Sequence, residues 1–395
     1  MSSQTLLTPS IITKNSLVIL KNNLVSATQV NRQFENQFVK IGTTLTIRKP
    51  NKFLVSSGPA LQLQDISEPS TTITISNQRH VDFQFTTSDL TLTIEEFRTR
   101  YLIPAMAELA NQVDYDVLGN FTSVHNIVGS PGTVPNAFSY VASVGQRLDE
   151  NAAPQDGRVL VLGPAAYWSM ATALTALYVQ SVSEPALKGF LATIANFKIF
   201  EDQNIQSITV GNYSGTPVVS GSSQTGANLV SSGWTASRTG LLNAGDVITA
   251  AGCYAINPKS RQSTGTLQNF LVTSTVNSDS NGNCTIPIYP AITTSGAYQT
   301  VSASPTSGGT ISVKTGNAAT AYQNNLAFTR DCFGLVMVPI ELPQGVDFAA
   351  RETYDNISLA VRRAYDINND VFPCRIDILY GDTCYYPELG CRLTN

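Results

Sequence analysis

The sequence predicts an α+β fold that is interrupted by a separate β-rich domain, and three observations support this prediction. Residues 41–48 and 73–85 alternate between apolar and polar side chains, which is typical of strands. Residues 93–120 carry apolar side chains at spacings of three and four, which is typical of an amphipathic helix. Residues 207–325 contain few charged side chains and are rich in Gly, Ser, Thr and Asn, which indicates an insertion of a different kind.

The N-terminal region is predicted to form a short helix over residues 9–23, followed by a two-stranded arm. The strands of the arm are expected within 39–53 and 70–85. Because an isolated ribbon of two strands is barely stable in water, such an arm needs a neighbour to lie against. We therefore expect the chain to be a building block of an assembly before we expect it to be an enzyme.

A long helix is predicted to follow the arm over residues 93–120. Thr93 and Glu96 match the T-x-x-E capping box that begins many helices. Pro104 is expected to kink or divide this helix, because proline lacks the backbone N–H that a helix interior uses. Gly119 is expected to end it.

The following segments predict a mixed α and β region. Residues 134–151 are expected to form a helix, 156–163 a buried strand, and 164–177 a helix that begins at a proline. Residues 190–199 fit either a short helix or a strand.

The inserted segment predicts a small β-barrel or sandwich, because short alternating segments recur between turn signals. The turn signals are NAGD at 243–246 and SNGN at 280–283. The expected strands are 247–251, 270–276, 285–289 and 310–314. Beyond the insertion, we expect a buried strand within 331–342. Residues 356–381 should form a helix or strand followed by a further strand, and 382–395 a short tail.

The composition excludes several classes of function. The formal net charge is −4 and no run of Lys or Arg is present, so the chain is not built to condense nucleic acid. There is no signal-peptide pattern and no apolar run of about 18 residues, so we expect no membrane span and a cytoplasmic location. Arg48, Lys49 and Lys52 make the nearest approach to a basic cluster, which we interpret as a solvated or subunit-contacting face. With Arg79, they are the candidate intersubunit contacts.

The residues that usually carry catalysis are nearly absent. The six cysteines include no C-x-x-C pair, so free thiols are favoured over disulfides or a zinc site. None of the common nucleotide-binding, hydrolase or metalloprotease motifs is present, and His80 and His125 are isolated. Four acidic residues near the C-terminus could be imagined as a metal cluster, namely Asp366, Asp370, Asp377 and Asp382. For the first two of these we favour turn formation, because they lie in YDINNDV, where Asn and Asp are natural turn formers. We expect no catalytic site, cofactor or metal.

The order of these parts resembles the major capsid (coat) protein of tailed bacteriophages, which has the Hong Kong 97 phage capsid fold. The passages that carry the resemblance are 22–53, which contains VNRQFENQFVKIGTTLTIRKP, and 355–393, which contains NISLAVRRAYDINNDVFPCRIDILYG. Within that family, the chain is similar to the coat proteins of short-tailed Salmonella-type phages, which carry an inserted β-barrel domain.

The resemblance implies a division of the chain into functional parts. Residues 1–38 would form an N-terminal arm, 39–90 an extended β loop that lies over an adjacent subunit, and 91–155 a peripheral domain with a spine helix. Residues 156–206 would form an axial domain, to which residues 330–345 would also contribute. Residues 207–325 would form the inserted β domain, and 326–395 the axial and peripheral return with the C-terminal tail.

The resemblance also implies the partners and the location of the protein. Copies of the chain would form the pentamers and hexamers of an icosahedral head, assembled in the host bacterial cytoplasm and located in the virion capsid. Scaffolding protein and portal would take part in assembly, a cement protein could be added, and double-stranded DNA would be enclosed non-specifically. Some members of the wider fold crosslink a lysine to an asparagine, and Lys49 and Lys52 are nominal candidates that we leave unassigned.

Two other classes of function stay open at this point. The first alternative is a phage decoration, tail or adhesin-like β protein, because modules rich in Ser, Thr and Gly are common there. The predicted long helix and mixed α/β segments argue against it. The second alternative is an enzyme of unknown type, which would need a concave site with convergent polar residues that the sequence does not show.

Overall fold

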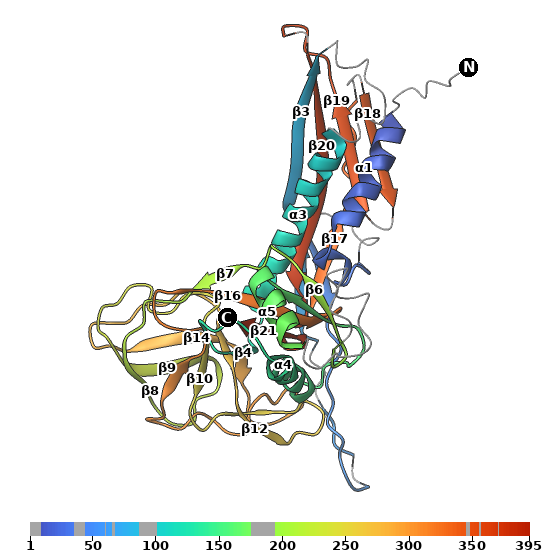
Figure 1. The fold of residues 1–395 in the computed structure, drawn as a ribbon. Coiled ribbons are helices and arrows are strands. Elements are labelled where there is room, and N and C mark those ends of the chain that lie inside the picture. The colour runs from blue at the N-terminus through green and yellow to red at the C-terminus, as the bar shows by residue number, and fades with distance from the viewer. Residues whose placement is uncertain are drawn as a thin grey trace. The chain divides into compact units, whose positions relative to one another are not determined.

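The computed structural model describes residues 9–34, 44–59, 61–64, 68–86, 101–174, 194–344, 348–354, 357–369 and 371–395 (Figure 1). The chain forms two compact units, and each combines segments that are far apart in the sequence. The first unit is built from Met1–Ile47, Ser70–Val117 and Phe333–Thr383. The second unit is built from Arg48–Pro69, Leu118–Cys332 and Cys384–Asn395.

The first unit is built on a five-stranded sheet. Four strands follow the order β17-β20-β19-β18, and β3 pairs antiparallel with β20 from Asn77 opposite Tyr380 to Thr86 opposite Val371. Alternate side chains of β20, including Ile376, Ile378 and Tyr380, are fully buried, as expected for a strand with one face against a core. The strands are β3 (Asn77–Thr86), β17 (Phe333–Met337), β18 (Phe348–Tyr354), β19 (Ile357–Arg363) and β20 (Val371–Cys384).

Two helices accompany this sheet. Helix α1 (Pro9–Asn23) packs against β18 and β19, and the short 3-10 helix η1 (Ser26–Thr28) follows it. Helix α3 (Ile103–Gly119) buries Met106, Leu109, Ala110 and Val113, which recur at the spacing of one helical face.

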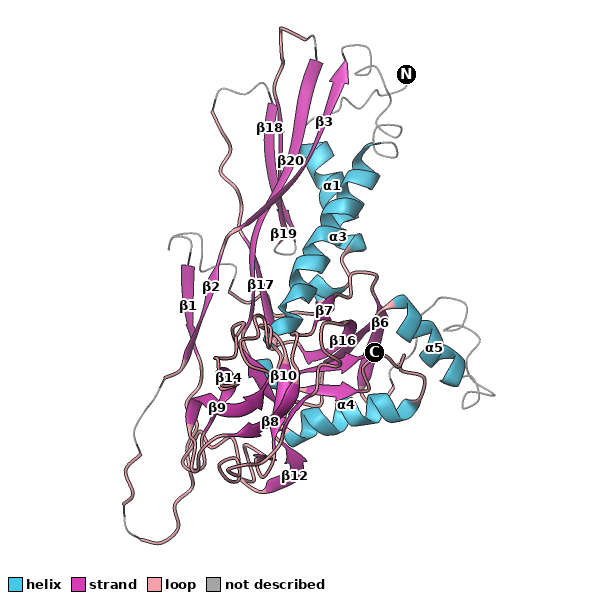
Figure 2. Cartoon of the chain, turned by 90° about the vertical axis from the view of Figure 1, so that its left-hand side faces the viewer, coloured by secondary structure: helices cyan, strands magenta, loops and turns pink. Residues whose placement is uncertain are grey.

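A separate two-stranded sheet is formed by β1 (Thr44–Arg48) and β2 (Ser70–Thr74), which run side by side (Figure 2). The two paired strands of the predicted arm are therefore present, but they are shorter than the sequence pattern suggested. The second alternating segment divides after Thr74, and β3 joins β20 instead. At this division Gly381 is required, because a Cβ atom there would clash with the carbonyl oxygen of Thr74.

The second unit contains a mixed six-stranded sheet with the order β4-β21-β16-β5-β6, and β7 also pairs with β16. The pairs β4–β21 and β5–β6 are parallel, and the pairs that β16 makes are antiparallel. Its strands are β4 (Ile127–Gly129), β5 (Arg158–Leu162), β6 (Phe197–Glu201), β7 (Ser207–Thr209), β16 (Ala321–Thr329) and β21 (Gly390–Thr394). The helices of this unit are α4 (Phe138–Glu150), α5 (Pro164–Leu174), η5 (Asn120–Ser123) and η7 (Pro387–Leu389).

The core of this mixed sheet is apolar and well covered. Helix α4 contributes Val141, Val144 and Leu148, and α5 contributes Tyr167 and Met170, to a cluster with side chains of β5, β6, β16 and β21. Because β21 lies between β4 and β16, the last residues of the chain are a central strand of the sheet.

The insertion is a closed six-stranded antiparallel barrel with the order β15-β10-β13-β14-β9-β8. A bridge between Val218 and Thr310 closes the barrel, and the Val219 N–H donates to the Gly309 carbonyl at 2.9 Å. The barrel strands are β8 (Gly215–Val219), β9 (Gly226–Trp234), β10 (Val247–Ala250), β13 (Phe270–Val272), β14 (Cys284–Ile292) and β15 (Ile311–Val313). A hairpin of β11 (Tyr254–Ile256) and β12 (Ser263–Leu267) forms its own two-stranded sheet.

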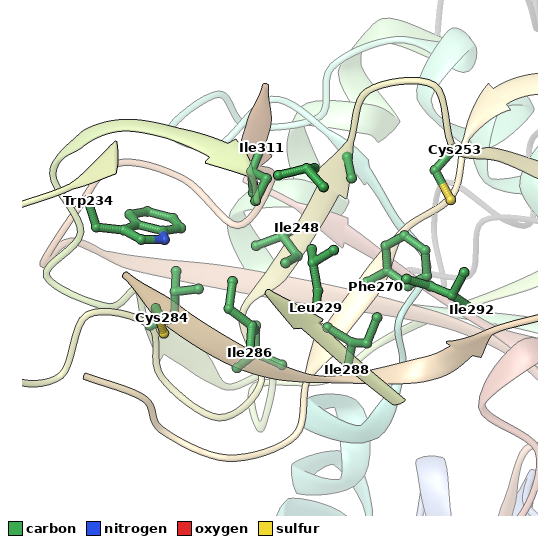
Figure 3. Packing of buried hydrophobic residues seen from close by; sticks show 14 of the residues in the cluster. Leu229, Trp234, Ile248, Cys253, Phe270, Cys284, Ile286, Ile288, Ile292 and Ile311 are labelled. Carbon is green, nitrogen blue, oxygen red and sulfur yellow. The ribbon is translucent and has the colours of Figure 1, made fainter. Parts of the chain in front are cut away.

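The barrel interior is filled by aliphatic and aromatic side chains. Leu229, Ile248, Phe270 and Ile286 come from four different strands, and all are fully buried (Figure 3). The bridge at Val218 and Thr310 joins the two ends of the sheet, and joined sheet edges protect a barrel from edge-to-edge association.

Many predicted elements are confirmed. Helix α1, the end of α3 at Gly119, helix α4, strand β5, the start of α5 at Pro164, and the four expected barrel strands are all present. The ambiguous segment 190–199 contains the start of strand β6. The predicted capping box at Thr93 and Glu96 lies outside the described residues.

Three features are not among these confirmed elements. Pro104 is the second residue of α3, and Tyr101 and Leu102 directly before this helix are π-helical. Residues 93–100 lie outside the described residues, so the expected kink or division at Pro104 stays a prediction. Strands β8 and β9 were not predicted, because their Gly and Ser residues hide the alternation. Strand β17, which lies within the predicted axial segment 330–345, joins the sheet of the first unit, and β16 lies beside β5 in the mixed sheet.

None of the helices among the described residues has the length and apolar character needed to cross a membrane.

The barrel core gives the first testable prediction. Leu229 is fully buried on β9, whereas its neighbour Val230 is 42% exposed on the opposite face. Leu229→Ala should lower the free energy of unfolding by about 2–5 kcal/mol, because it leaves a cavity in a packed core. Val230→Ala, the matched control, should lower it by less than about 1 kcal/mol. Urea denaturation followed by fluorescence would measure both, and equal losses would contradict the described orientation of β9.

Candidate assembly arm and anchor of the inserted barrel

The arm loop, defined as Arg48–Pro69, holds three of the four predicted contact residues. Arg48 Nη1 lies 3.0 Å from Glu68 Oε2 across the loop. The Lys49 N–H donates to the Pro69 carbonyl at 2.7 Å, and its Nζ lies 4.9 Å from the centre of the Tyr386 ring. Each of these contacts fixes the point where the loop leaves its strands.

The insertion also contacts the arm loop. Tyr298, in the loop after β14, accepts a hydrogen bond from the Lys52 N–H at 3.4 Å and donates to Asn51 Oδ1 at 3.2 Å. Lys52 Nζ lies 6.0 Å from the centre of the Tyr298 ring. Within the predicted basic cluster, Arg48 therefore forms an ion pair, whereas Lys49 and Lys52 each lie near an aromatic ring.

The far part of the arm loop exposes apolar side chains. Val55, Leu61 and Leu63 have exposed fractions between 84% and 102%, and Phe53 is 63% exposed. Gln64 connects the two sides of the arm loop. Its Oε1 accepts a hydrogen bond from the Leu54 N–H at 2.8 Å, and its Nε2 donates one to the Leu54 carbonyl at 2.6 Å. Apolar residues gathered on one exposed loop are typical of an interaction surface.

Arg79, the fourth predicted residue, is used inside the first unit. Its Nε and Nη2 donate to Asp116 Oδ2 of α3 at 3.0 and 2.7 Å. Tyr380 donates to the same oxygen at 2.5 Å. These hydrogen bonds raise the pKa of Arg79, and they hold α3 against β3 and β20.

A second aspartate of α3 fixes the segment after α1. Asp114 is buried, and its carboxylate accepts from the N–H groups of Val25 and Ala27 at 2.8 and 2.7 Å. Charged acceptors make short, strong hydrogen bonds of this kind. Sequence analysis did not single out Asp114 or Asp116, because a pattern of apolar residues does not show which polar side chains of a helix are buried.

Arg392 of β21 anchors the inserted barrel to the mixed sheet. Its side chain is fully buried, and it donates from Nη1 to the Gly245 carbonyl at 2.8 Å and from Nη2 to the Thr122 carbonyl at 3.0 Å. The guanidinium lies 5.5 Å from the centre of the Phe121 ring. Burial lowers the pKa of Arg392 to about 9, and the nearby Asp246 partly opposes this shift. The side chain therefore remains charged at neutral pH.

The turn that receives Arg392 is built by the predicted NAGD sequence. Gly245 has φ of +96°, and a Cβ atom there would lie 2.7 Å from Ile208 Cδ1. Asp246 is fully buried, and its Oδ2 accepts from the N–H groups of Gly211 and Asn243 at 3.0 and 2.8 Å. Burial raises the pKa of Asp246, whereas these hydrogen bonds lower it.

Arg147 of α4 makes a second polar connection to the insertion. Its Nη1 donates to Glu150 Oε2 at 3.0 Å and to Thr266 Oγ1 at 2.8 Å, and its Nη2 donates to the Leu267 carbonyl at 3.3 Å. Thr266 in turn donates to Glu150 Oε2 at 3.1 Å. Helix α4 and strand β12 are thereby joined through one buried charge pair.

His125 lies between these two anchors. It packs edge-on against Tyr289, with 5.7 Å between ring centres. Burial, together with the positive charges of Arg147 and Arg392, lowers the pKa of His125 to about 3. The imidazole is therefore neutral at physiological pH.

Of the four acidic residues considered as a metal cluster, Asp370 lies outside the described residues, and the other three do not come together. Asp366 accepts from the Asn368 N–H in a hairpin turn, Asp377 accepts from Arg375 in the sheet, and Asp382 accepts from Asn77. In the part of the chain that the structure describes, no group of three His, Cys, Asp or Glu residues is placed to hold a metal ion.

The comparison with protein families gives one match over almost the whole chain. The family model described as P22 coat protein, gene protein 5, matches residues 3–395. A curated relative, the major capsid protein of Acyrthosiphon pisum secondary endosymbiont phage 1, is 28% identical over 168 residues. That match covers 40% of this chain and only 39% of the relative.

Solved structures can also be aligned with most of the chain. A structure from Mycobacterium phage Che8 aligns with a TM-score of 0.50 and 12% identity, covering 94% of this chain and 90% of that chain. The capsid structure of the Cyanophage P-SCSP1u aligns with a TM-score of 0.43 and 11% identity, covering 90% and 84% of the two chains. The first of these alignments shows a shared fold.

The anchor gives a second prediction. Arg392→Met should lower the free energy of unfolding by about 3 kcal/mol, because two buried carbonyl groups lose their donor. Arg238→Met is the matched control, since Arg238 also donates to a backbone carbonyl, that of Asn212, but at an exposed site. The control should lose less than about 1 kcal/mol in the same chemical denaturation measurement. An unchanged stability of Arg392→Met would contradict the anchor.

His125 gives a third prediction, on pH dependence. Because its pKa is about 3 in the folded protein and 6.5 as the reference value, the unfolded state binds the proton more readily. This contribution to stability is complete above the reference pKa and is lost as pH falls toward the folded pKa. Between pH 7.5 and 5.5, wild type should lose about 1.4 kcal/mol more than His125→Phe. Chemical denaturation at both pH values would test this, and parallel losses would refute it.

Proposed function

Because the chain belongs to the P22 coat protein family and is therefore a phage major capsid protein, we propose that it assembles as pentamers and hexamers into an icosahedral head. Its fold is the α+β Hong Kong 97 phage capsid fold with an inserted β-barrel, as the sequence predicted. The head would be that of a tailed phage with double-stranded DNA.

The exposed apolar arm loop is the observation that carries this proposal. Val55, Leu61 and Leu63 are almost fully exposed, and a two-stranded ribbon has little stability of its own. Packing of this loop on an adjacent copy would bury those side chains. In a closed shell, each such contact is repeated many times, so that modest interfaces together give a stable particle.

The basic residues near the arm loop would have different roles. Arg48, Lys49 and Lys52 lie at exposed or partly exposed positions of the loop, which supports their assignment as contacts to a neighbouring copy. Arg79 is held by Asp116 in its own subunit, so its contribution to an interface would be indirect. The mixed sheet of the second unit would form the axial part at the centre of each pentamer or hexamer.

The remaining partners follow from a role in head assembly. The proposal includes a scaffolding protein and a portal during assembly, a cement protein on the finished head, and non-specific enclosure of double-stranded DNA. The net charge of −4 supports the last point, because a mildly acidic protein does not trap DNA that a motor drives inward. Assembly would take place in the host bacterial cytoplasm, and the chain would have no catalytic activity.

The alternative of a decoration, tail or adhesin-like β protein is not favoured. The family match includes the long helix and the mixed sheet as well as the barrel.

Assembly of variant chains tests the proposal and gives a fourth prediction. Wild type, expressed with the neighbouring phage genes, should form closed shells, or open spirals and tubes, in negative-stain electron microscopy and sedimentation. The double variant Leu61→Ser, Leu63→Ser should remain as small species, because its arm loop offers little apolar surface to a neighbour. Gln62→Ser, on the same loop, is the control and should assemble.

The thermal stability of the unassembled subunit should be the same in all three proteins, because these side chains are exposed in it. A wild-type chain that stays a monomer when it is expressed with the neighbouring phage genes would contradict the proposed function. Normal shells from the double variant would contradict the role of the arm loop alone.

A further inference from the structure

A cavity of about 430 Å³ lies between α4 and the inserted barrel. Helix α4 runs beside the barrel on the side of β12 (Figure 1), and Arg147 and Thr266 join the two directly. The cavity is lined by Arg147 and Glu150 of α4, Thr249 of β10, Thr266 of β12, and Lys314, which follows β15. Its volume is within the range of small-molecule sites, which is about 300–1,000 Å³.

Two side chains that line this cavity have unused hydrogen-bonding atoms. Arg147 is 7% exposed, and its Nε is buried without a hydrogen-bond partner. The Thr249 hydroxyl makes no hydrogen bond with the described residues, although it is not one of the buried atoms without a partner. Because buried polar atoms are nearly always satisfied by protein, water or an ion, the Nε of Arg147 indicates an occupant.

The charge of the cavity indicates the kind of occupant. Glu150 accepts from Arg147 and Thr266 through Oε2 and from Gln146 through Oε1, so its negative charge is already compensated. Lys314 makes no side-chain hydrogen bond or ion pair with the described residues, and its ammonium group is a further donor. The charged side chains that line the cavity are Arg147, Lys314 and Glu150, which leaves one positive charge without a counterpart.

We propose that this cavity is a binding site for a phosphate group, held by Lys314, Arg147 and Thr249. The three donors come from three separate elements, an arrangement that suits the several oxygens of a tetrahedral anion better than the two coplanar oxygens of a carboxylate. The cavity is larger than one phosphate ion needs, so the group could belong to inorganic phosphate or to a small phosphate monoester. A bound phosphate would bridge α4 and the barrel. This inference does not depend on shell formation.

Isothermal titration calorimetry of the full chain tests the proposal. Inorganic phosphate and glucose 6-phosphate would be titrated separately, in chloride buffer of constant ionic strength. At least one should bind saturably at a single site and raise the Tm of the chain over the same concentration range. Tighter binding of glucose 6-phosphate would assign the site to monoesters, and equal or tighter binding of inorganic phosphate would assign it to the free ion.

Lys314→Gln should weaken the affinity by about 10- to 100-fold, because one charge-assisted hydrogen bond is lost. Lys314 is exposed, so the Tm of this variant in chloride alone should match that of wild type. Lys259→Gln removes an exposed charge elsewhere on the insertion and should bind as wild type does. Absence of binding heat with both ligands, or unchanged affinity in Lys314→Gln, would overturn the proposal.

Discussion

The burial of one guanidinium is the constraint on which the second unit depends. Arg392 is without solvent, so its charge is tolerated only while the carbonyls of Gly245 and Thr122 accept its hydrogen bonds. One of these carbonyls belongs to the barrel and the other lies next to the mixed sheet. The C-terminal strand, the segment after α3 and the turn 243–246 must therefore be in place together. A buried polar anchor of this kind fixes a unique arrangement more than it adds stability.

The sequence predicted those elements whose signals are local. The turn at 243–246 was recognisable from Gly245 and Asp246, the end of α3 from Gly119, and the inner strands of the barrel from their alternation. Pairing over long distances was not recognisable. Strand β3 lies almost 300 residues from its partner β20, and nothing in its pattern distinguishes pairing with β20 from continuation of the arm. Local patterns set the type of an element, whereas the partner is chosen by the whole core.

The same limit applies to the candidate site. Arg48, Lys49 and Lys52 were found because they are adjacent basic residues on a predicted loop, and the structure places them on that loop. Arg392 and Arg147 were missed, because each is a single cation in a short segment and its partners in the insertion are distant in sequence. The available signal was weak: a lone arginine within the strand GCRLT, at a position where a central strand would bury it. Such a residue needs acceptors, but the sequence does not identify them.

The second unit contains two firmly joined parts and also an exposed apolar loop. The barrel and the mixed sheet are joined by buried polar contacts, whereas the arm loop carries apolar side chains with no cover from the chain itself. In the proposed shell, such a subunit would keep its inserted domain in a fixed position, and another copy would cover the apolar side chains of the arm loop. This division suits a particle built from many identical contacts, in which each subunit must keep its own shape before its neighbours are present.

The most direct test of this account is native-state hydrogen exchange of the unassembled full chain, followed by mass spectrometry. Peptides that cover the turn 243–246, the segment 120–123 and strand β21 should exchange with the same opening free energy, because Arg392 requires all three together. That result would establish the barrel and the mixed sheet as one cooperative body. Free exchange of the turn 243–246 while β21 remains protected would contradict the account, because the barrel would then open independently of its anchor.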